Sequence, residues 1–214
     1  MVLKKEIYEL YKGSGPLTKL YLRIKLRICP FLLMEGFFPT SGKIVDLGCG
    51  NGLFSFILKL GSPSREIFGF DLDKKKINVA RAIQKAFMGI QFEVGNIVEM
   101  RYPKADVLTL IDVLYLIPFA KQQEILEKCS GVLKTGGWLI LKEMDTRPRW
   151  KYGWNIFQEA LAVKIIGFTL GEKFYFRSRE DYSRLLTSLG FQVKAVSLDK
   201  GYWYPHILYV CQKS

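Results

Sequence analysis

Short apolar runs alternate with segments of helical periodicity along most of the chain. Five runs have the length and composition of strands buried in a sheet, at residues 43–47, 66–70, 91–94, 106–111 and 138–142. Helical patterns lie between them, at residues 53–60, 73–87 and 121–133. Strands that alternate with helices form parallel sheets covered on both faces. The pattern therefore predicts a doubly wound α/β fold.

The rhythm changes after the fifth predicted strand. Residues 146–177 are rich in aromatic side chains with basic residues between them, which indicates an insertion. Ser178 and Asp181 then have the spacing of a capping box that begins a helix. Two β-rich runs follow, at residues 191–198 and 206–212, and they should pair antiparallel because no helix separates them. We expect a seven-stranded sheet, mostly parallel, whose last strand runs antiparallel.

Residues 17–33 have the spacing of an amphipathic helix ahead of the first strand. An apolar stripe recurs at helical spacing, with Lys and Arg at other positions. The stripe consists of Leu17, Leu20, Tyr21, Ile24, Ile28 and Phe31, and the basic residues are Lys19, Arg23, Lys25 and Arg27. Pro30 lacks a backbone N–H and should end or kink this helix. We expect residues 1–39 to form a helical segment that, together with the insertion at 146–177, caps a core domain over residues 40–214.

The composition fits one folded domain with an elaborated edge. The 214 residues are 49% hydrophobic and 24% charged, which is ordinary for a globular protein and argues against a disordered or repetitive chain. The net charge is +12, and residues 1–40 and 142–179 carry eight of the excess positive charges. Such a bias suits nucleic acid, an anionic membrane surface or an acidic substrate. It equally suits a surface that is only solubilising.

The cysteine pattern indicates a reducing compartment, and the hydropathy pattern argues against a secretory signal and a membrane span. The four cysteines are scattered, without a CxxC pair or a nearby histidine, so we expect reduced thiols and no metal site. Charges throughout residues 1–30 leave no apolar core for a secretory signal. The most apolar stretch, residues 105–120, is too short to span a bilayer. We expect a cytoplasmic protein, whose basic N-terminal helix is a candidate for peripheral contact with the inner, anionic face of a membrane.

The sequence VDLGCGNG at residues 45–52 carries the clearest chemical signal. It places a glycine-rich turn between a strand and a helix, where the backbone can approach a nucleotide-like ligand. The spacing G-x-G-x-G differs from the G-x-G-x-x-G of dinucleotide sites. Asp46 can reach toward a cationic group, and Asp71 can accept hydrogen bonds from ribose hydroxyls. The arrangement fits a ligand with an ammonium group and a ribose but no phosphate, and S-adenosylmethionine is such a ligand.

At these residues the sequence resembles the class I S-adenosylmethionine-dependent methyltransferase superfamily, which has a Rossmann-like fold. The resemblance runs from about residue 40 to the end of the chain. Residues 46–52 are similar to the family's first motif, which wraps the methionine part of the cofactor, and Asp71-Leu72 is similar to the loop that holds the ribose and adenine. The resemblance implies contacts from S-adenosylmethionine to Asp46, Gly48, Cys49, Gly50, Asp71 and Leu72.

Three later segments agree with the same family. Asn96-Ile97 falls where the family contacts the adenine edge, although Asn96 replaces the usual aspartate and is a weaker, neutral acceptor. The fourth-strand motif is similar to residues 105–114 and implies that Ile111 and Asp112 lie beside the methionine. Residues 133–138 are similar to the turn before the fifth strand. Five motifs in order make the resemblance specific.

Methyl transfer requires alignment and a dry pocket, and it requires a base only where the nucleophile must lose a proton. Reactive groups in such a sheet lie at the carboxyl ends of the strands. Glu143 and Asp145, after the fifth strand, are the candidates to face the substrate. His206, the only histidine, is a third candidate as a general base, with a packed structural role as its alternative. Asp112 is expected to be a cofactor contact or a strand-end cap.

The two capping segments indicate the class of acceptor. Eight aromatic residues within 146–177 suit a small, partly apolar metabolite or a lipid-like molecule, since ligand pockets are mostly apolar. The alternative within enzymes is an RNA methyltransferase, supported by the charge and the interleaved Arg and aromatic residues. The sequence at residues 112–115 lacks the Asn/Asp-Pro-Pro-aromatic motif of amino-base methylation. A non-catalytic, cofactor-binding or membrane-associated protein is a further alternative, against which the intact glycine loop and Asp71 argue.

Overall fold

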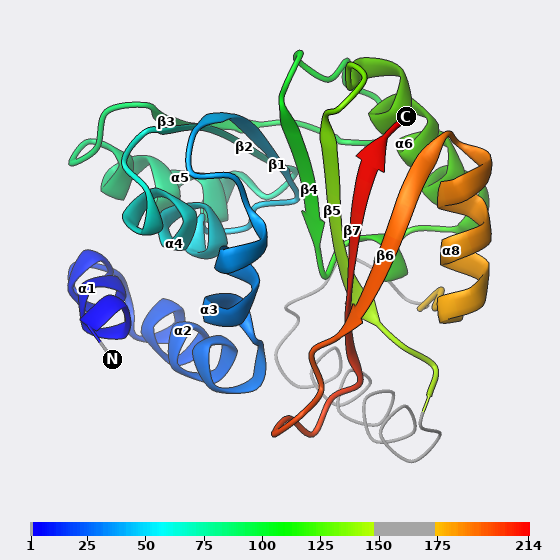
Figure 1. Ribbon diagram of the computed structural model, residues 1–214. Helices are drawn as coiled ribbons and strands as arrows, with labels where there is room; N and C mark the ends of the chain where they lie inside the picture. The colour runs from blue at the N-terminus through cyan, green and yellow to red at the C-terminus, as the bar shows by residue number, and fades with distance from the viewer. Residues whose placement is uncertain (1, 148–173) are drawn as a thin grey trace.

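A central seven-stranded sheet organises the protein, whose computed structural model describes residues 2–147 and 174–214 (Figure 1). The strands follow the order β3-β2-β1-β4-β5-β7-β6. Their bounds are β1 (Gly42–Leu47), β2 (Arg65–Asp71), β3 (Ile90–Val94), β4 (Val107–Ile111), β5 (Trp138–Met144), β6 (Phe191–Ser197) and β7 (His206–Lys213). Within this sheet β7 alone runs in the opposite direction, so it is antiparallel to both of its neighbours, β5 and β6. The predicted seven-stranded, mostly parallel sheet with an antiparallel last strand is confirmed.

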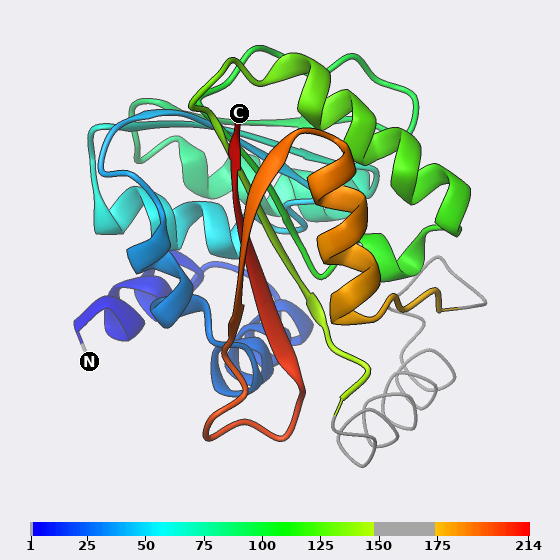
Figure 2. The same cartoon turned by 45° about the vertical axis from the view of Figure 1, so that its right-hand side comes forward.

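Helices cover both faces of the sheet. They are α1 (Val2–Leu10), α2 (Pro16–Ile28), α3 (Phe31–Met34), α4 (Leu53–Gly61), α5 (Lys74–Gln84), α6 (Phe119–Val132) and α8 (Arg179–Ser188), with short 3-10 turns η1 (Glu35–Phe37) and η2 (Leu114–Leu116). One hydrophobic cluster packs the helices α1 through α5 against one face of the sheet. A second cluster packs α6 and α8 against the other face. Figure 2 shows α6 and α8 side by side on that second face. Alternate residues of each strand supply the two clusters.

Local sequence explains where two of the helices begin. The Asp73 carboxylate accepts a hydrogen bond from the backbone N of Lys75 at 2.8 Å and so caps α5. The Ser178 hydroxyl accepts from the backbone N of Asp181 at 3.1 Å and caps α8. Both caps satisfy N–H groups that a helix leaves unpaired at its start. The predicted starts of these helices are confirmed.

The N-terminal segment agrees with the prediction at Pro30 and differs from it in two ways. The helix predicted over residues 17–33 ends at Ile28, as expected for a helix that meets Pro30, which cannot continue the hydrogen-bond ladder. A separate helix, α1, precedes it and was not predicted. The face of α2 that packs inward carries Leu22 and Leu26, whereas Leu17, Leu20 and Ile24 of the predicted apolar stripe are exposed.

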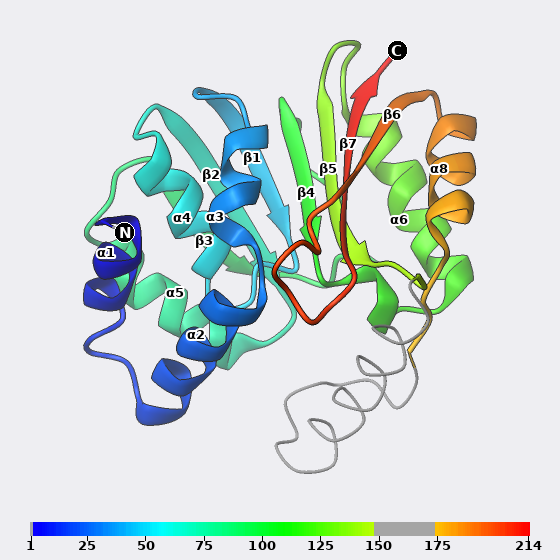
Figure 3. The same cartoon turned by 60° about the horizontal axis from the view of Figure 1, so that its bottom comes forward.

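The N-terminal helices lie at the functional end of the sheet. Figure 3 shows α2 beside the carboxyl ends of the parallel strands, where the glycine-rich loop follows β1. The Tyr11 hydroxyl donates to the backbone O of Asn51 in that loop at 2.8 Å. The capping role of residues 1–39 stays a prediction.

Most of the aromatic-basic insertion, residues 148–173, lies outside the described residues. Its final part is described and packs on the loop after β4. The Phe176 ring stacks on Tyr115 with centroids 5.1 Å apart, and the backbone N of Tyr175 donates to Tyr115 O at 2.7 Å.

Among the helices of the described ranges, none has the length and apolarity needed to cross a bilayer.

Candidate functional site

The glycine-rich loop after β1 combines close packing with one open position. Gly48, Gly50 and Gly52 have φ values of 83°, 58° and 80°, in the left-handed region that glycine adopts freely. A Cβ at Gly48 would collide with Val113, and one at Gly52 would lie 2.8 Å from the Phe92 ring. A Cβ at Gly50 would meet no protein atom within 4 Å. The loop therefore presents its bare backbone to a ligand at Gly50.

Asp71 ties this loop to the end of β2. One carboxylate oxygen accepts from the backbone N of Gly50 at 2.8 Å, and the other accepts from the backbone N of Asp73 at 2.9 Å. Each carboxylate oxygen can accept more than one hydrogen bond, so the group retains capacity for two vicinal hydroxyls. The next residue, Leu72, is 56% exposed, which suits an apolar wall for a planar base.

Asp46, near the end of β1, is buried, and Cys49 of the loop is partly buried. The Asp46 side chain is buried and accepts from the Ser55 hydroxyl of α4 at 2.5 Å. Burial raises the pKa of this carboxyl to about 7, and the Ser55 hydrogen bond opposes the rise. The partly buried Cys49 thiol donates to the backbone O of Gly50 at 3.8 Å. The direct contacts predicted from these two residues to the ligand stay predictions.

The loop after β3 would form the adenine end of a nucleoside site. The Asn96 side-chain oxygen accepts from the backbone N of Val98 at 3.0 Å, so it already serves its own turn. Ile97 is buried, and its backbone O accepts from the Tyr102 hydroxyl at 2.6 Å. These bonds fix the loop beside Asp71, because β2 and β3 are paired up to Asp71 and Val94.

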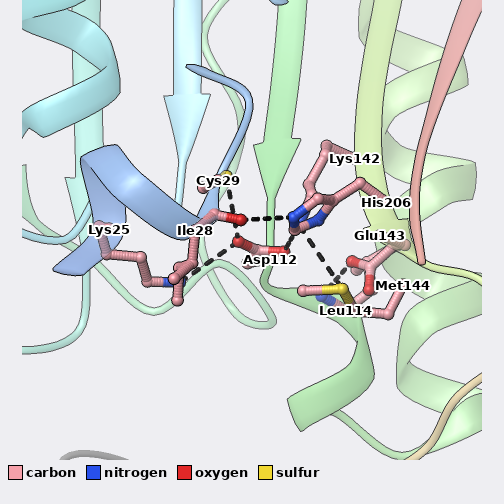
Figure 4. Close-up of polar contacts among 9 residues, drawn as sticks. All are labelled: Lys25, Ile28, Cys29, Asp112, Leu114, Lys142, Glu143, Met144 and His206. Atoms are coloured by element: carbon pink, nitrogen blue, oxygen red, sulfur yellow. Dashed lines mark hydrogen bonds and ion pairs between the residues drawn. The ribbon is translucent and has the colours of Figure 1, made fainter. Parts of the chain in front are cut away.

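Asp112, after β4, is the centre of a buried ionic cluster (Figure 4). Its φ of 58° is the only positive value at a non-glycine residue of the described ranges. The carboxylate pairs with the buried Lys142 ammonium of β5 and, at 3.3 Å, with the Lys25 ammonium of α2. Burial alone would raise the pKa of Asp112, but Lys142 and Lys25 hold it well below its usual range. We call Lys25, Asp112 and Lys142 the lysine–aspartate cluster.

His206, at the start of β7, closes the cluster on its other side. Its Nε2 lies 2.6 Å from the backbone O of Ile28, and since a carbonyl only accepts, Nε2 carries the proton. The Nδ1 atom is buried and has no hydrogen-bond partner within the described part of the chain. Burial, followed by the Lys142 charge, lowers the pKa of the ring to about 3. The imidazole is therefore neutral at physiological pH.

The structure does not place Glu143 on the face that carries the cluster. Glu143 neighbours Lys142 in β5, so its side chain points to the opposite face of the sheet. One of its oxygens accepts from the backbone N of Leu114 at 2.9 Å. The other is buried without a partner among the residues described. Burial, aided by Asp112, raises the pKa of Glu143 to about 8.

Asp145 lies just beyond β5 and is partly exposed. Its backbone N donates to Pro205 O at 2.7 Å, and its carboxylate accepts from the backbone N of Thr146. Of the three predicted catalytic residues, the structure brings His206 to the lysine–aspartate cluster and leaves Glu143 and Asp145 elsewhere. The catalytic roles of all three stay predictions.

Several residues of the site escaped the sequence reasoning. The helical pattern places Lys25 only among the basic positions beside the apolar stripe, and Tyr21, one turn earlier, only within that stripe. Burial raises the pKa of Tyr21, and the negative charges of Asp112 and Asp71 add to the rise. A lysine at the end of the apolar strand WLILK was a signal for Lys142. Within the described ranges, no group of three or more His, Cys, Asp or Glu side chains could hold a metal ion.

Comparison with known proteins agrees with this geometry. A family model described as a methyltransferase domain matches residues 40–172. A carboxy-S-adenosyl-L-methionine synthase from Campylobacter jejuni subsp. doylei is 31% identical over 124 residues, 58% of this chain and 52% of the relative. A ubiquinone biosynthesis O-methyltransferase from Leptothrix cholodnii is 24% identical over 50% of this chain and 46% of the relative. The chain spans about half the length of the curated relatives it matches.

Solved structures show the same fold. An O-methyltransferase family protein from Burkholderia thailandensis gives a TM-score of 0.70 at 17% identity, covering 90% of this chain and 57% of that one. The magnesium protoporphyrin IX methyltransferase of Synechocystis gives 0.64 at 20% identity, covering 86% and 79%. Because the family model covers more than half of the chain and the strand order agrees with the fold, the chain belongs to the methyltransferase-domain family, with the class I Rossmann-like fold.

Proposed function

We propose that the protein is an S-adenosylmethionine-dependent methyltransferase that acts on a small, partly apolar metabolite or a lipid-like acceptor. The observation that carries the cofactor assignment is the pairing of Gly50 with Asp71. An open backbone position and a carboxylate held at 2.8 Å from it form one cradle at the carboxyl edge of the sheet. Nucleoside ligands of doubly wound folds bind at this edge.

The chain's own residues fit such a cofactor. Asp71 would accept the ribose hydroxyls, and the exposed Leu72 with Ile97 would flank the adenine. The bare backbone at Gly48 and Gly50 would lie along the amino-acid part. Ile111 and Asp112, at the end of β4, would lie beside the same part. The spacing G-x-G-x-G at residues 48–52, in place of the G-x-G-x-x-G of dinucleotide sites, favours S-adenosylmethionine over a dinucleotide.

S-adenosylmethionine, when bound, supplies an activated methyl group on a sulfonium. The protein then has to align the acceptor and exclude water. The Tyr11 hydroxyl, bonded to the backbone O of Asn51, ties the N-terminal segment to the loop and would support that exclusion.

The geometry orders the three candidate proton acceptors. We propose Asp145 as the first, because it is partly exposed beyond β5. Glu143 is internal, and its pKa near 8 keeps much of it protonated at neutral pH. His206 has a pKa near 3 and holds a proton poorly. If the Asp145→Asn variant retains full turnover on an acceptor that must be deprotonated, this order is wrong.

The acceptor class rests on two observations. The described end of the insertion packs aromatic rings, Phe174 and Phe176, against Tyr115 at the end of β4. Relatives include enzymes named for ubiquinone biosynthesis, and one solved neighbour from Planctomyces limnophilus is a complex with apigenin. An RNA acceptor is the alternative that the net charge of +12 supports.

We also propose peripheral contact with an anionic membrane through the outer face of α2. Leu17, Leu20 and Ile24 are 68%, 54% and 45% exposed, and Arg23 and Arg27 are exposed on the same face. Apolar and basic residues on one exposed face suit the boundary of an anionic bilayer. Co-sedimentation with phosphatidylglycerol vesicles tests the membrane contact, and binding that survives Leu20→Glu would exclude the α2 face.

The four free cysteines support a reducing, cytoplasmic location.

Calorimetric titration with S-adenosylhomocysteine tests the cofactor assignment. We expect one site in the wild-type protein and an affinity at least about tenfold lower in Asp71→Ala, because hydrogen bonds to a charged group are lost. Asp73→Ala is the matched control, because it also removes a carboxylate, two residues along the chain, but one that serves only as the cap of α5. Absence of binding to the wild-type protein would contradict the proposal.

Transfer of a labelled methyl group tests the acceptor class. Wild-type protein with labelled S-adenosylmethionine is offered phenols, carboxylic acids, a lipid extract and total RNA in parallel. Label in a small or lipid-like fraction supports the proposal. Label in RNA alone, with steep salt dependence, would establish the alternative.

A further inference from the structure

Glu143 buries a carboxyl group in an apolar part of the sheet. The side chain is 1% exposed and shares its face of β5 and β7 with Leu141 and Ile207. One of its two oxygens has no hydrogen-bond partner among the residues that the structure describes, and burying a polar atom in this way costs free energy. An apolar side chain at this position would avoid that cost. The acid is therefore explained by what its other oxygen does.

The other oxygen of Glu143 fixes the loop after β4. It accepts from the backbone N of Leu114 at 2.9 Å (Figure 4). Hydrogen bonds from the backbone of Leu114 and Val113 oppose the rise that burial causes in the pKa of Glu143. On the far side of the same residue, the Gln122 side chain of α6 donates to Leu114 O at 2.9 Å. Gln122 thus holds the half of the loop that leads to α6, and Glu143 holds the half that follows Asp112.

The half of the loop that Glu143 holds borders the glycine-rich loop. Asp112 has a φ of 58°, a conformation that a non-glycine residue keeps only where the surrounding structure fixes it. The next residue, Val113, packs so closely on Gly48 that an added Cβ there would collide with its side chain. The Leu114 N–H is the first backbone donor after these two residues. Its bond to Glu143 therefore restrains a turn that lies directly against the cofactor loop.

We propose that Glu143 is a positioning residue for the cofactor. By holding the Leu114 backbone, it keeps the turn at residues 112–113 against the glycine-rich loop, along the amino-acid part of S-adenosylmethionine. This inference rests on the proposed function, to which it adds a residue that acts without touching the ligand. A turn released from this bond has to be ordered when the ligand binds, and that ordering lowers the affinity. The loss falls on the amino-acid part, because the contacts expected for ribose and adenine lie on the other side of β1.

The test compares two ligands that differ only in the amino-acid part. S-adenosylhomocysteine and methylthioadenosine share the adenine, the ribose and a thioether sulfur, and only the first carries the amino acid. Each is titrated by calorimetry into wild-type protein and into each variant. We expect wild type to prefer S-adenosylhomocysteine. Glu143→Leu should reduce this preference at least about fivefold, while its affinity for methylthioadenosine stays within about twofold of wild type.

Two further variants separate the hydrogen bond from general damage. Glu143→Gln keeps a side-chain oxygen that can accept from Leu114, so it should restore the wild-type preference. Thr109→Val is the matched control, because it removes another buried hydrogen bond between β4 and β5, from the Thr109 hydroxyl to Ile140 O at 2.9 Å, that does not involve the loop. A thermal melt shows that each variant is folded at the temperature of the titration. Glu143→Met, which keeps an unbranched side chain, replaces Glu143→Leu if the leucine variant is unfolded.

The outcomes separate the inference from the function on which it rests. A reduced preference in Glu143→Leu, with the wild-type preference in Glu143→Gln and Thr109→Val, supports the inference. An unchanged preference in Glu143→Leu, an equal loss of affinity for both ligands, or an equal reduction in Thr109→Val overturns it. A preference as low in Glu143→Gln as in Glu143→Leu also overturns it, because the charge and not the bond to Leu114 would then matter. Failure of S-adenosylhomocysteine to bind wild-type protein refutes the proposed function and the inference together, and it appears in the wild-type titration alone.

Discussion

Removal of the Asp112 charge should destabilise the protein strongly, because Lys142 is fully buried and depends on it. Asp112→Asn keeps the shape and suits the positive φ at this position, since asparagine tolerates the left-handed region. It leaves the Lys142 and Lys25 ammonium groups without a counter-charge. Breaking a buried pair by removing one partner costs about 3–5 kcal/mol. We expect a loss of this order, which for a chain of this size lowers Tm by roughly 10 °C.

Urea unfolding followed by circular dichroism measures the loss. The double variant Asp112→Asn with Lys142→Met removes both partners, and it should recover a large part of the stability, because an apolar side chain replaces the stranded ammonium. Asp106→Asn is the matched control. Its pair with Lys134 spans 2.8 Å but is exposed, with side chains 42% and 74% accessible, so we expect a loss of only about 0–1 kcal/mol.

Equal losses in Asp112→Asn and Asp106→Asn would refute the reasoning. They would mean that the buried charge of Lys142 finds water or another partner once Asp112 is neutral. Failure of the double variant to recover stability would show instead that Asp112 acts through its backbone geometry and not through its charge.

Three further predictions follow from buried charges. Arg65 is 1% exposed and donates to Glu35 at 2.6 Å and to three backbone carbonyls. Arg65→Met should lower the free energy of unfolding by about 3–5 kcal/mol, and Arg65→Lys should be destabilised as well, because lysine lacks the planar fork of donors. Urea unfolding measures both variants, and wild-type stability in Arg65→Lys would contradict this prediction. Because the pKa of Glu143 is raised, its contribution to stability is present below about pH 4.5 and is lost as the pH rises through about 8. The free energy of unfolding of Glu143→Gln should therefore match that of wild type at pH 4 and exceed it at pH 9 by on the order of 4 kcal/mol. A difference that stays constant between these pH values would exclude the raised pKa. Lys142→Met should raise the pKa of His206 above about 3, because the Lys142 ammonium helps to lower it. NMR titration of the single histidine measures this pKa. An unchanged pKa would mean that the Lys142 charge does not act on the His206 ring.

The sequence predicted the sheet well because each strand carries its own signal. The seven apolar runs predicted all seven strands, and five of the runs are followed directly by Gly or Asp. The absence of a helix between the last two runs predicted their antiparallel pairing. The glycine loop and Asp71 were found for the same reason, since a strand, a turn and a helix are contiguous in the chain. Local periodicity gives the element, and its neighbours give the sheet.

The lysine–aspartate cluster could not be predicted from periodicity. Lys25 and Asp112 are 87 residues apart and meet only because α2 folds over the end of β4. The same folding buries Leu22 and Leu26 of α2 and exposes Leu17, so the helical pattern alone misassigned the inward face. His206 was found as the only histidine, but its contact with Ile28 depends on the same tertiary arrangement.

We propose that S-adenosylmethionine lies against the backbone at Gly50, which Asp71 holds in place at 2.8 Å. Calorimetric titration of S-adenosylhomocysteine into Gly50→Asn, compared with Gly136→Asn, tests it most directly. Both glycines have positive φ, at 58° and 81°, and neither has a protein atom within 4 Å of an added Cβ, so the two substitutions carry similar backbone strain. We predict that Gly50→Asn lowers the affinity at least about tenfold while Gly136→Asn binds as wild type does. Wild-type affinity in a folded Gly50→Asn variant would contradict the claim.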